Sequence, residues 1–433
     1  MTLNLAPADL PKDGGRFDLA IALGILAASG QLPGTALDGL ECLGELALSG
    51  AIRPVRGVLP AALAARDARR VLVVPKENAE EASLASGLTV FAVDHLLEIA
   101  GHLSGQAPLP PYQARGLLRA PFPYPDLAEV QGQAAAKRAL LVAAAGAHNL
   151  LLSGPPGTGK TLLASRLPGL LPALDEDEAL EVAAIHSVAS HVPLRHWPQR
   201  PFRQPHHSAS APALVGGGSR PQPGEITLAH QGVLFLDELP EFERKVLEVL
   251  REPLESGEIV IARANGRVRF PARFQLVAAM NPCPCGYLGD PSGRCRCTPE
   301  QVQRYRGKLS GPLLDRIDLH VSVLRESTSL QPGHGETATA EVSERVGAAR
   351  QRQLARQGCA NAHLDLQAMH RNCALAEADR RWLEAAGERL ELSLRALHRI
   401  LKVARTLADL ERIDAIERRH LAEALQYRAM TST

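Results

Sequence analysis

Several features are scarce or lacking in this sequence, and each of them narrows the range of possible functions. Aromatic residues make up 3% of the 433 residues, which argues against recognition of bases by stacking on aromatic rings. An excess of one charge sign is lacking, because 48 Lys and Arg residues against 47 Asp and Glu residues leave a net charge of +1. Any nucleic-acid surface must therefore be local. Long apolar runs are missing too, since no stretch approaches the roughly 20 residues of a membrane helix. We expect a cytoplasmic protein without a membrane segment.

Cysteine is also scarce, and the seven cysteines are spaced unlike an extracellular disulfide framework. Four of them crowd into one short segment in the pattern C-x-C-x₉-C-x-C, namely Cys283, Cys285, Cys295 and Cys297. Four thiolates in a short loop can hold Zn²⁺ tetrahedrally, although C-x-C is tighter than the usual spacing. Free thiols in a structural loop are the alternative. Disulfides are disfavoured in the reducing compartment that we expect.

Length and patterning predict about three domains. Residues 1–100 alternate short β-like runs with helical patterns, and residues 101–128, with six prolines, are typical of a linker. Residues 129–330 carry uniformly apolar runs, as parallel strands covered on both faces do. Residues 331–433 show the pattern of amphipathic helices. We therefore expect an α/β core with a parallel sheet, preceded by an α+β domain and followed by an all-α domain.

A glycine-rich segment matches the pattern G-x-x-x-x-G-K-[ST] between a predicted strand and a predicted helix. Its residues are Gly154, Pro155, Pro156, Gly157, Thr158, Gly159, Lys160 and Thr161. Glycines let the backbone wrap tightly, so that successive N–H groups and the helix N-terminus face a phosphate. Lys160 would neutralise the β- and γ-phosphates of ATP, and the Thr161 hydroxyl would coordinate Mg²⁺.

Two further apolar strands are predicted to end in polar residues. Residues 233–239 end in Asp237 and Glu238, and residues 274–281 end in Asn281. Ligands of open α/β sheets bind at the carboxyl ends of the strands. Asp237 would complete the Mg²⁺ environment, and Glu238 would polarise the water that attacks the γ-phosphate. Asn281 could position the same water.

An insertion and a hairpin interrupt the α/β pattern. Residues 200–225 contain three consecutive glycines (Gly216–Gly218) between prolines and are expected to lack regular secondary structure. Residues 257–274 predict a β-hairpin, because two β-like runs flank Asn265-Gly266. This hairpin carries one glutamate, Glu258, and four arginines, namely Arg263, Arg267, Arg269 and Arg273. The arginines could form a basic track for DNA phosphates, or simply a solvated cationic face.

Taken together, these motifs resemble the AAA+ ATPases. The insertion and the hairpin are similar to those of the magnesium-chelatase-like branch and, within it, to the ComM/YifB subfamily, over residues 1 to about 430. The resemblance implies a P-loop AAA+ core with a helical lid, in which Asn281 is the first sensor. It also implies that ATP is bound between the subunits of a ring.

Two arginines gain expected roles from the same resemblance. Arg316 is in the place of the arginine finger, which stabilises charge in a neighbouring subunit's transition state. Its plainer alternative is a surface pair with Asp315 or Asp318, which would be worth little. Arg395 is in the place of the second sensor of the lid, and a solvated arginine on a helix is the alternative there.

The first 100 residues resemble the Lon-type protease fold, but without its catalytic pair. Arg16 stands where the resemblance implies a nucleophilic serine, and Leu59 where it implies the activating lysine. Neither side chain can perform these steps near pH 7. We therefore expect a degenerate, structural domain. It also begins abruptly, as if strands before it were missing.

These observations favour a Mg²⁺-dependent, ring-forming ATPase that acts on single-stranded or branched DNA. The ComM/YifB resemblance implies a homo-hexameric helicase that promotes branch migration during natural transformation. A magnesium-chelatase motor subunit is one alternative, although the Lon-like region is not expected there. An ATP-dependent protein remodeller without protease activity is the other.

Overall fold

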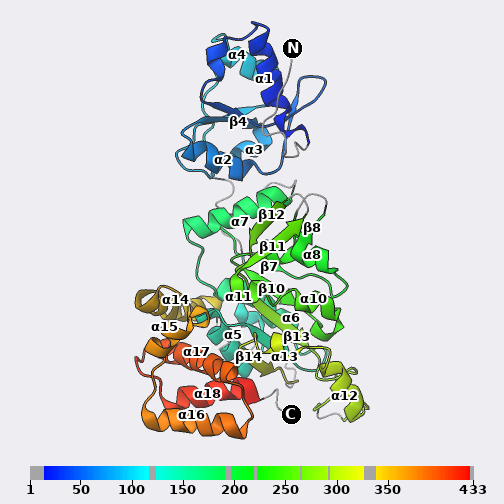
Figure 1. The fold of residues 1–433 in the computed structure, drawn as a ribbon, viewed down its shortest axis with the longest axis vertical. Coiled ribbons are helices and arrows are strands. Elements are labelled where there is room, and N and C mark those ends of the chain that lie inside the picture. The colour runs from blue at the N-terminus through cyan, green and yellow to red at the C-terminus, as the bar shows by residue number, and fades with distance from the viewer. Residues whose placement is uncertain are drawn as a thin grey trace. The chain divides into compact units, whose positions relative to one another are not determined.

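The computed structural model describes seven stretches of the chain, which fall into two units (Figure 1). The stretches are residues 14–116, 123–190, 197–218, 222–263, 266–290, 293–325 and 338–429. The first unit contains the described residues of 1–122 and 174–199, and the second contains the described residues of 123–173 and 200–433. Residues 174–199 thus belong with the amino-terminal unit, whereas the sequence pattern placed them within the α/β core of residues 129–330.

A five-stranded parallel sheet forms the centre of the second unit (Figure 1). Alternate strand residues enter different apolar clusters, with Leu150 and Leu152 in one and Leu151 in the other. Both faces are therefore covered, which explains why the strands are apolar throughout. This sheet and the helical carboxyl-terminal region confirm the expected fold class. The strands, in spatial order, are β14 (Leu319–Ser322), β6 (Leu150–Ser153), β13 (Gln275–Met280), β10 (Val233–Leu236) and β7 (Phe202–Arg203).

One face of the sheet is covered by long helices and by the carboxyl-terminal helices, and the other by short helices. Helix α17 shows why the carboxyl-terminal helices pack as they do, because it buries Ala396, Ile400 and Val403 on one side at spacings of three or four residues. The long helices are α5 (Ala134–Gly146) and α6 (Lys160–Leu170), followed by α14 (Thr339–Gln357), α15 (Leu366–Asn372), α16 (Glu377–Arg389), α17 (Leu394–Leu410) and α18 (Arg418–Ala429). The short ones include α9 (Glu225–Leu228), α10 (Arg244–Glu248), α11 (Pro253–Ser256), α12 (Pro299–Arg306) and α13 (Gly311–Leu314).

The insertion at 200–225 is more regular than expected. Helix α8 (Ala211–Val215) leads into β8 (Gly216–Gly217), which pairs antiparallel with β9 (Gln222–Pro223). Gly216 has φ +98°, and a Cβ on it would lie 2.2 Å from the carbonyl oxygen of Gln222. The expectation of no regular structure is therefore wrong, because glycine allows two backbones to approach more closely than any side chain would permit.

The predicted hairpin is present as β11 (Glu258–Arg263) and β12 (Gly266–Pro271), paired antiparallel in register. Ile259 and Ile261 are buried in the second unit, and Arg269 on the other face is exposed. This alternation is what a strand with one buried face requires. Residues 264–265 of the predicted turn lie outside the described residues.

In the first unit, a three-stranded parallel sheet carries the strands predicted near 69–75 and 87–93. Its strands, in spatial order, are β1 (Leu40–Cys42), β4 (Val71–Pro75) and β5 (Val90–Val93), beside a small β2 (Glu45–Leu46) and β3 (Ile52–Arg53) pair. Its helices are α1 (Asp18–Ala28), α2 (Val58–Asp67), α3 (Lys76–Ala82), α4 (Leu96–Leu103) and α7 (Glu176–Ala189).

Helix α7 joins the first unit through an apolar face. Ala179, Leu180 and Ala183 of α7 are buried in one cluster with Leu59. The Leu59 N–H donates to Ser187 Oγ (3.3 Å), and the Gly57 N–H donates to the Ser187 carbonyl oxygen (2.9 Å). Leu59, at the position of the missing lysine, is thus covered by α7.

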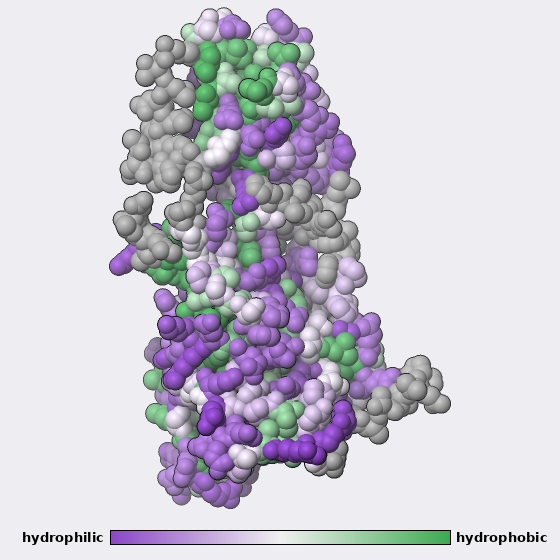
Figure 2. Space-filling view, turned by 90° about the vertical axis from the view of Figure 1, so that its right-hand side faces the viewer, coloured by the Kyte–Doolittle hydropathy of each residue, from purple (hydrophilic) through white to green (hydrophobic). Residues whose placement is uncertain are grey.

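The described helices include none that is long and apolar enough to cross a bilayer. On the face drawn in Figure 2, the lower part of the molecule, which holds the carboxyl-terminal helices, is mostly hydrophilic, and its hydrophobic residues are scattered.

Candidate nucleotide-binding site

The glycine-rich segment, Gly154 to Thr161, forms the loop between β6 and the amino terminus of α6, as predicted. We refer to it below as the phosphate loop. Gly157 and Gly159 have φ values of +76° and +84°, a region that residues with a Cβ rarely adopt. The Thr158 hydroxyl donates to the carbonyl oxygen of Pro155 at 2.9 Å. A Cβ on Gly154 would lie 2.1 Å from the backbone oxygen of Val323. The loop is thus held in place on both sides before the helix begins.

Lys160 is buried at the first turn of α6 and makes only neutral contacts. Its ammonium donates to the carbonyl oxygens of Gly154 (2.8 Å) and Pro155 (2.9 Å) and to Asn281 Oδ1 (3.3 Å). Among the described residues, no carboxylate lies within ion-pair distance of it. Burial lowers the pKa of Lys160, against the opposite pull of the carboxylates of Asp237 and Glu238. A cation held by neutral acceptors fits a phosphate, which would supply the counter-charge.

Thr161 and Asp237 lie together at the carboxyl edge of the sheet. The Thr161 hydroxyl donates to Asp237 Oδ2 at 2.7 Å, and the Glu238 N–H donates to Asp237 Oδ1 at 2.9 Å. A hydroxyl and a carboxylate in contact, beside a phosphate loop, are the oxygen ligands that Mg²⁺ accepts. The predicted pair thus fits a magnesium ion.

Glu238 occupies a strained backbone position beside a histidine that the sequence analysis missed. Its φ is +52°, and its side chain is exposed. His207 Nδ1, from the insertion, lies 3.1 Å from Glu238 Oε2. Backbone strain of this kind often occurs at functional sites. No pattern in the sequence pointed to His207, because the insertion around it has no regular periodicity.

We expect His207→Ala to lower the rate of ATP hydrolysis about tenfold, with little change in the KM for ATP. His207 would orient the Glu238 carboxylate without touching the nucleotide, and positioned general bases contribute about 10²–10⁴-fold. Steady-state turnover at saturating ATP measures this. His206→Ala is the matched control, because His206 Nδ1 bonds instead to Ser208 Oγ at 2.8 Å. Equal losses in both variants would mean that His207 has no special link to Glu238.

The two predicted cationic residues Arg316 and Arg395 meet at one carboxylate. Arg316 is buried, and its Nη2 pairs with Glu255 Oε1 at 2.6 Å. Arg395, which is exposed, pairs with the same oxygen. Burial raises the pKa of the Glu255 carboxyl, but the two guanidinium groups outweigh that effect and lower it. In the described chain, no hydrogen bond or ion pair joins this cluster directly to Lys160 or Glu238.

The alternative that Arg316 pairs with Asp315 or Asp318 is wrong, because both aspartates contact other residues. Asp318 is buried and pairs with Arg399, and its other oxygen lies 3.6 Å from His148 Nδ1. Asp315 lies 4.0 Å from Arg428 Nη1. Both aspartates are therefore engaged elsewhere, and Glu255 holds Arg316 instead.

The four clustered cysteines converge at the end of β13. Their sulfur atoms all lie within 4.8 Å of one another. The N–H of Tyr287 helps to lower the pKa of the Cys285 thiol to about 6. The cluster follows Asn281 directly and therefore belongs to the surroundings of the phosphate loop.

The predicted basic face is present on the hairpin. Arg267 and Arg269 are exposed on β12, and Arg269 lies 3.8 Å from Glu258 across the pair. Arg273, after the hairpin, is exposed as well. The side chain of Arg263 lies outside what the structure describes.

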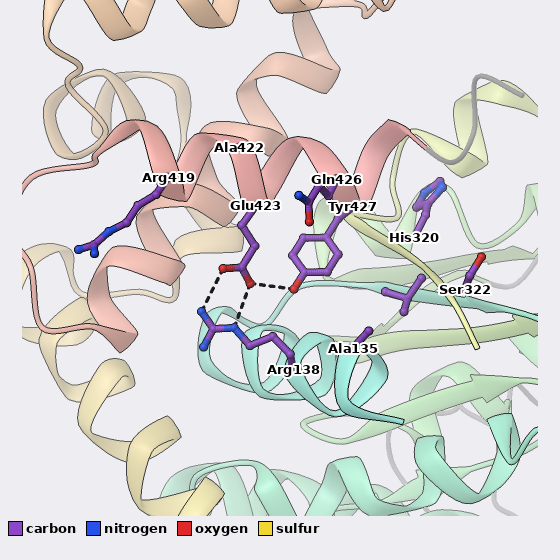
Figure 3. A pocket seen from close by; sticks show the side chains of 10 residues that line it. Ala135, Arg138, His320, Ser322, Arg419, Ala422, Glu423, Gln426 and Tyr427 are labelled. Atoms are coloured by element: carbon purple, nitrogen blue, oxygen red, sulfur yellow. Dashed lines mark hydrogen bonds and ion pairs between the residues drawn. The ribbon is translucent and has the colours of Figure 1, made fainter. Parts of the chain in front are cut away.

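A cavity of about 660 Å³ lies elsewhere, between α5, β14 and α18 (Figure 3). Arg138 Nε pairs with Glu423 Oε1 at 2.9 Å, and the Tyr427 hydroxyl donates to the same oxygen at 3.0 Å. None of the predicted phosphate-contacting residues lines this cavity. The ion pair in it joins α5 to α18, so we assign no ligand to it.

Family models match most of the chain. Residues 126–330 match the model described as magnesium chelatase, subunit ChlI, and residues 336–428 match that subunit's C-terminal model. Residues 1–78 match a model described as subunit ChlI of Mg-chelatase.

Curated relatives match over different lengths. The chain is 54% identical to "Competence protein ComM" of Haemophilus influenzae, over 99% of this chain and 86% of that protein. It is 51% identical to the uncharacterized protein YifB of Escherichia coli, over 99% and 85%. The magnesium-chelatase 38 kDa subunit of Cereibacter sphaeroides is 27% identical, over 48% and 60%.

Proposed function

The chain belongs to the ComM/YifB family of magnesium-chelatase-like AAA+ ATPases, and from this premise we propose that it forms a ring that hydrolyses ATP to move along DNA. Its task in this proposal is branch migration when DNA recombines during natural transformation. The ATPase activity in this proposal is supported by two hydrogen bonds at the phosphate loop, one from Lys160 to Asn281 and one from Thr161 to Asp237.

In this proposal, each residue at the carboxyl edge of the sheet has a separate role in ATP hydrolysis. Lys160 would exchange its carbonyl partners for the β- and γ-phosphates, and Thr161 and Asp237 would hold Mg²⁺. The metal, when bound, neutralises charge that develops on the phosphates. Glu238 orients the attacking water and accepts its proton, and Asn281 fixes the same water from the next strand. Arg316 would leave Glu255 and reach the site of the adjoining subunit of a homo-hexamer, so that assembly is a condition of turnover.

The DNA part of the proposal is supported by the basic face of the hairpin. Arg267 and Arg269 are exposed and point away from the core, where phosphates can approach. Contacts of this kind depend on backbone charge and are sequence-independent. The low aromatic content agrees with this mode. A relative that matches nearly the whole chain is named a competence protein, which agrees with the task proposed in natural transformation.

We expect DNA to stimulate ATP hydrolysis and the double variant Arg267→Gln, Arg269→Gln to lose most of that stimulation. Each lost phosphate contact should also reduce the slope of log affinity against log salt by about 0.7 for single strands. Turnover is measured without polymer and with single-stranded, duplex and four-way-junction DNA. The control is Arg380→Gln, Arg381→Gln, two exposed arginines that pair with Glu377 on α16. If DNA changes neither turnover nor assembly in the unaltered protein, the DNA assignment is wrong.

A chelatase motor subunit is the second candidate. The descriptions of the matching family models favour it, and the match over residues 1–78 removes the amino-terminal region as evidence against it. The curated chelatase relative matches only about half of this chain. A chelatase motor would not respond to DNA, so the same assay separates the two. We also propose that the first unit has no protease activity, since α7 covers Leu59 and Arg16 replaces a nucleophile.

A further inference from the structure

The four thiols of the cysteine cluster lie close enough together to share one small ion, since all their sulfur atoms are within 4.8 Å of one another. The Sγ atoms of Cys283 and Cys285 are 3.4 Å apart, those of Cys283 and Cys295 are 3.7 Å apart, and those of Cys285 and Cys295 are 3.6 Å apart. Tetrahedral zinc with Zn–S bonds of about 2.3 Å sets its sulfur atoms about 3.8 Å apart. A disulfide would instead need about 2.05 Å. The observed spacing therefore fits shared coordination of a single ion.

The charge around the cluster fits the same ion. Four thiolates on one divalent cation leave a net charge of about −2. Arg294 and Arg296 stand beside the third and fourth cysteines and bring two positive charges to the loop. A set of four sulfur ligands in a tetrahedral arrangement selects zinc, or iron, over the harder Mg²⁺.

The cysteine loop rests against the phosphate loop. Gly286 lies in the turn that Cys283 opens, and its N–H donates to the Cys283 carbonyl oxygen at 2.9 Å. Gly286 has φ +85°, and a Cβ on it would lie 2.8 Å from Cδ of Pro156 and 3.7 Å from Cγ of Asn281. Only a glycine allows this contact. The turn from Cys283 to Gly286 therefore packs closely against Pro156 of the phosphate loop, with Asn281 beside it.

We propose that Cys283, Cys285, Cys295 and Cys297 bind one Zn²⁺ ion, and that this ion keeps the cysteine loop seated against the phosphate loop. The ion is structural, since four protein ligands leave no open position for water. Its role is to pre-organise the nucleotide site, because Gly286 of the cysteine loop packs against Pro156 of the phosphate loop. The zinc site can be present whether or not the protein acts on DNA.

The metal content tests the first half of this proposal. Protein purified without added metal should contain about one zinc per chain by plasma mass spectrometry. Cys283→Ser, Cys295→Ser should contain almost none, and the control Cys359→Ser, a half-buried thiol outside the loop, should keep the ion. Replacement by Co²⁺ should give the intense visible bands of a tetrahedral thiolate site. Less than a tenth of an equivalent of zinc, zinc retained in the double variant, or iron in its place would each overturn the assignment.

The second half is tested on the intact protein, so that a failure of the variant to fold does not decide it. Zinc is released from the unaltered chain by titration with a mercurial, while circular dichroism follows the fold. Affinity for a fluorescent ATP analogue should then fall at least fivefold, a typical coupling between neighbouring sites, and should return when thiol and zinc are restored. An unchanged affinity after complete zinc release would overturn the link to the phosphate loop.

Discussion

Glu238→Gln should reduce ATP hydrolysis about 10³-fold and leave ATP binding intact, because removal of a general base removes about 10²–10⁴-fold of catalysis. Glutamine keeps the shape of the side chain and meets the same backbone strain at φ +52°, so the loss isolates the carboxylate. Lys160→Ala should instead lose both binding and hydrolysis, because the buried ammonium is the counter-charge of the phosphates.

Equilibrium binding of a labelled ATP analogue and single-turnover hydrolysis separate these two outcomes. Glu243→Gln is the matched control, as an exposed glutamate that precedes α10 in the same segment. Hydrolysis retained in Glu238→Gln, or lost equally in Glu243→Gln, would contradict the assigned role of Glu238.

Arg316→Ala should reduce hydrolysis by about 10³-fold or more, as the loss of an arginine finger does in other NTPases. The variant should still bind ATP, because Arg316 makes no direct contact with Lys160 or Asp237 within its own chain. The decisive form of the experiment uses two inactive variants. Arg316→Ala retains a complete phosphate loop, and Lys160→Ala retains the arginine, so a mixed ring can place one against the other.

In a head-to-tail ring, each active site combines the phosphate loop of one subunit with Arg316 of its neighbour. When the two inactive variants are mixed at random and at equal concentration, about a quarter of the contacts join an intact phosphate loop to an intact Arg316. The mixture should therefore show about a quarter of the unaltered rate per chain. Each variant alone and an unmixed sum are the controls. If the mixture stays inactive while it assembles as the unaltered chain does, Arg316 does not act across subunits. Activity of Arg316→Ala alone would also exclude it as the finger.

The part of the site that lies on the sheet could be predicted because it follows from local pattern. Parallel strands end at a common edge, so the loop after β6, Asp237 after β10 and Asn281 after β13 had to lie near one another. The structure does bring Lys160 to Asn281 and Thr161 to Asp237. The catalytic roles of these residues stay predictions.

The parts that could not be predicted depend on contacts between segments far apart in sequence. His207 reaches Glu238 from an insertion without periodicity, and Glu255 pairs with an arginine 61 residues later and another 140 residues later. Nothing in the apolar pattern of α7 says which hydrophobic cluster it will enter. The glycines and prolines predicted no regular secondary structure in the insertion, although Gly216 and Gly217 are what allows β8 to pair with β9.

The route of the chain through α7 has a consequence for any attempt to dissect the protein. The polypeptide enters the amino-terminal unit, leaves it to build the phosphate loop and α6, and returns to it for one helix before completing the sheet. Deleting residues 14–116 would therefore expose Leu180 and Ala183 of α7 to solvent, because these side chains pack against Leu59 of the deleted segment. A shortened form of the protein should therefore keep residues 14–116 together with α7.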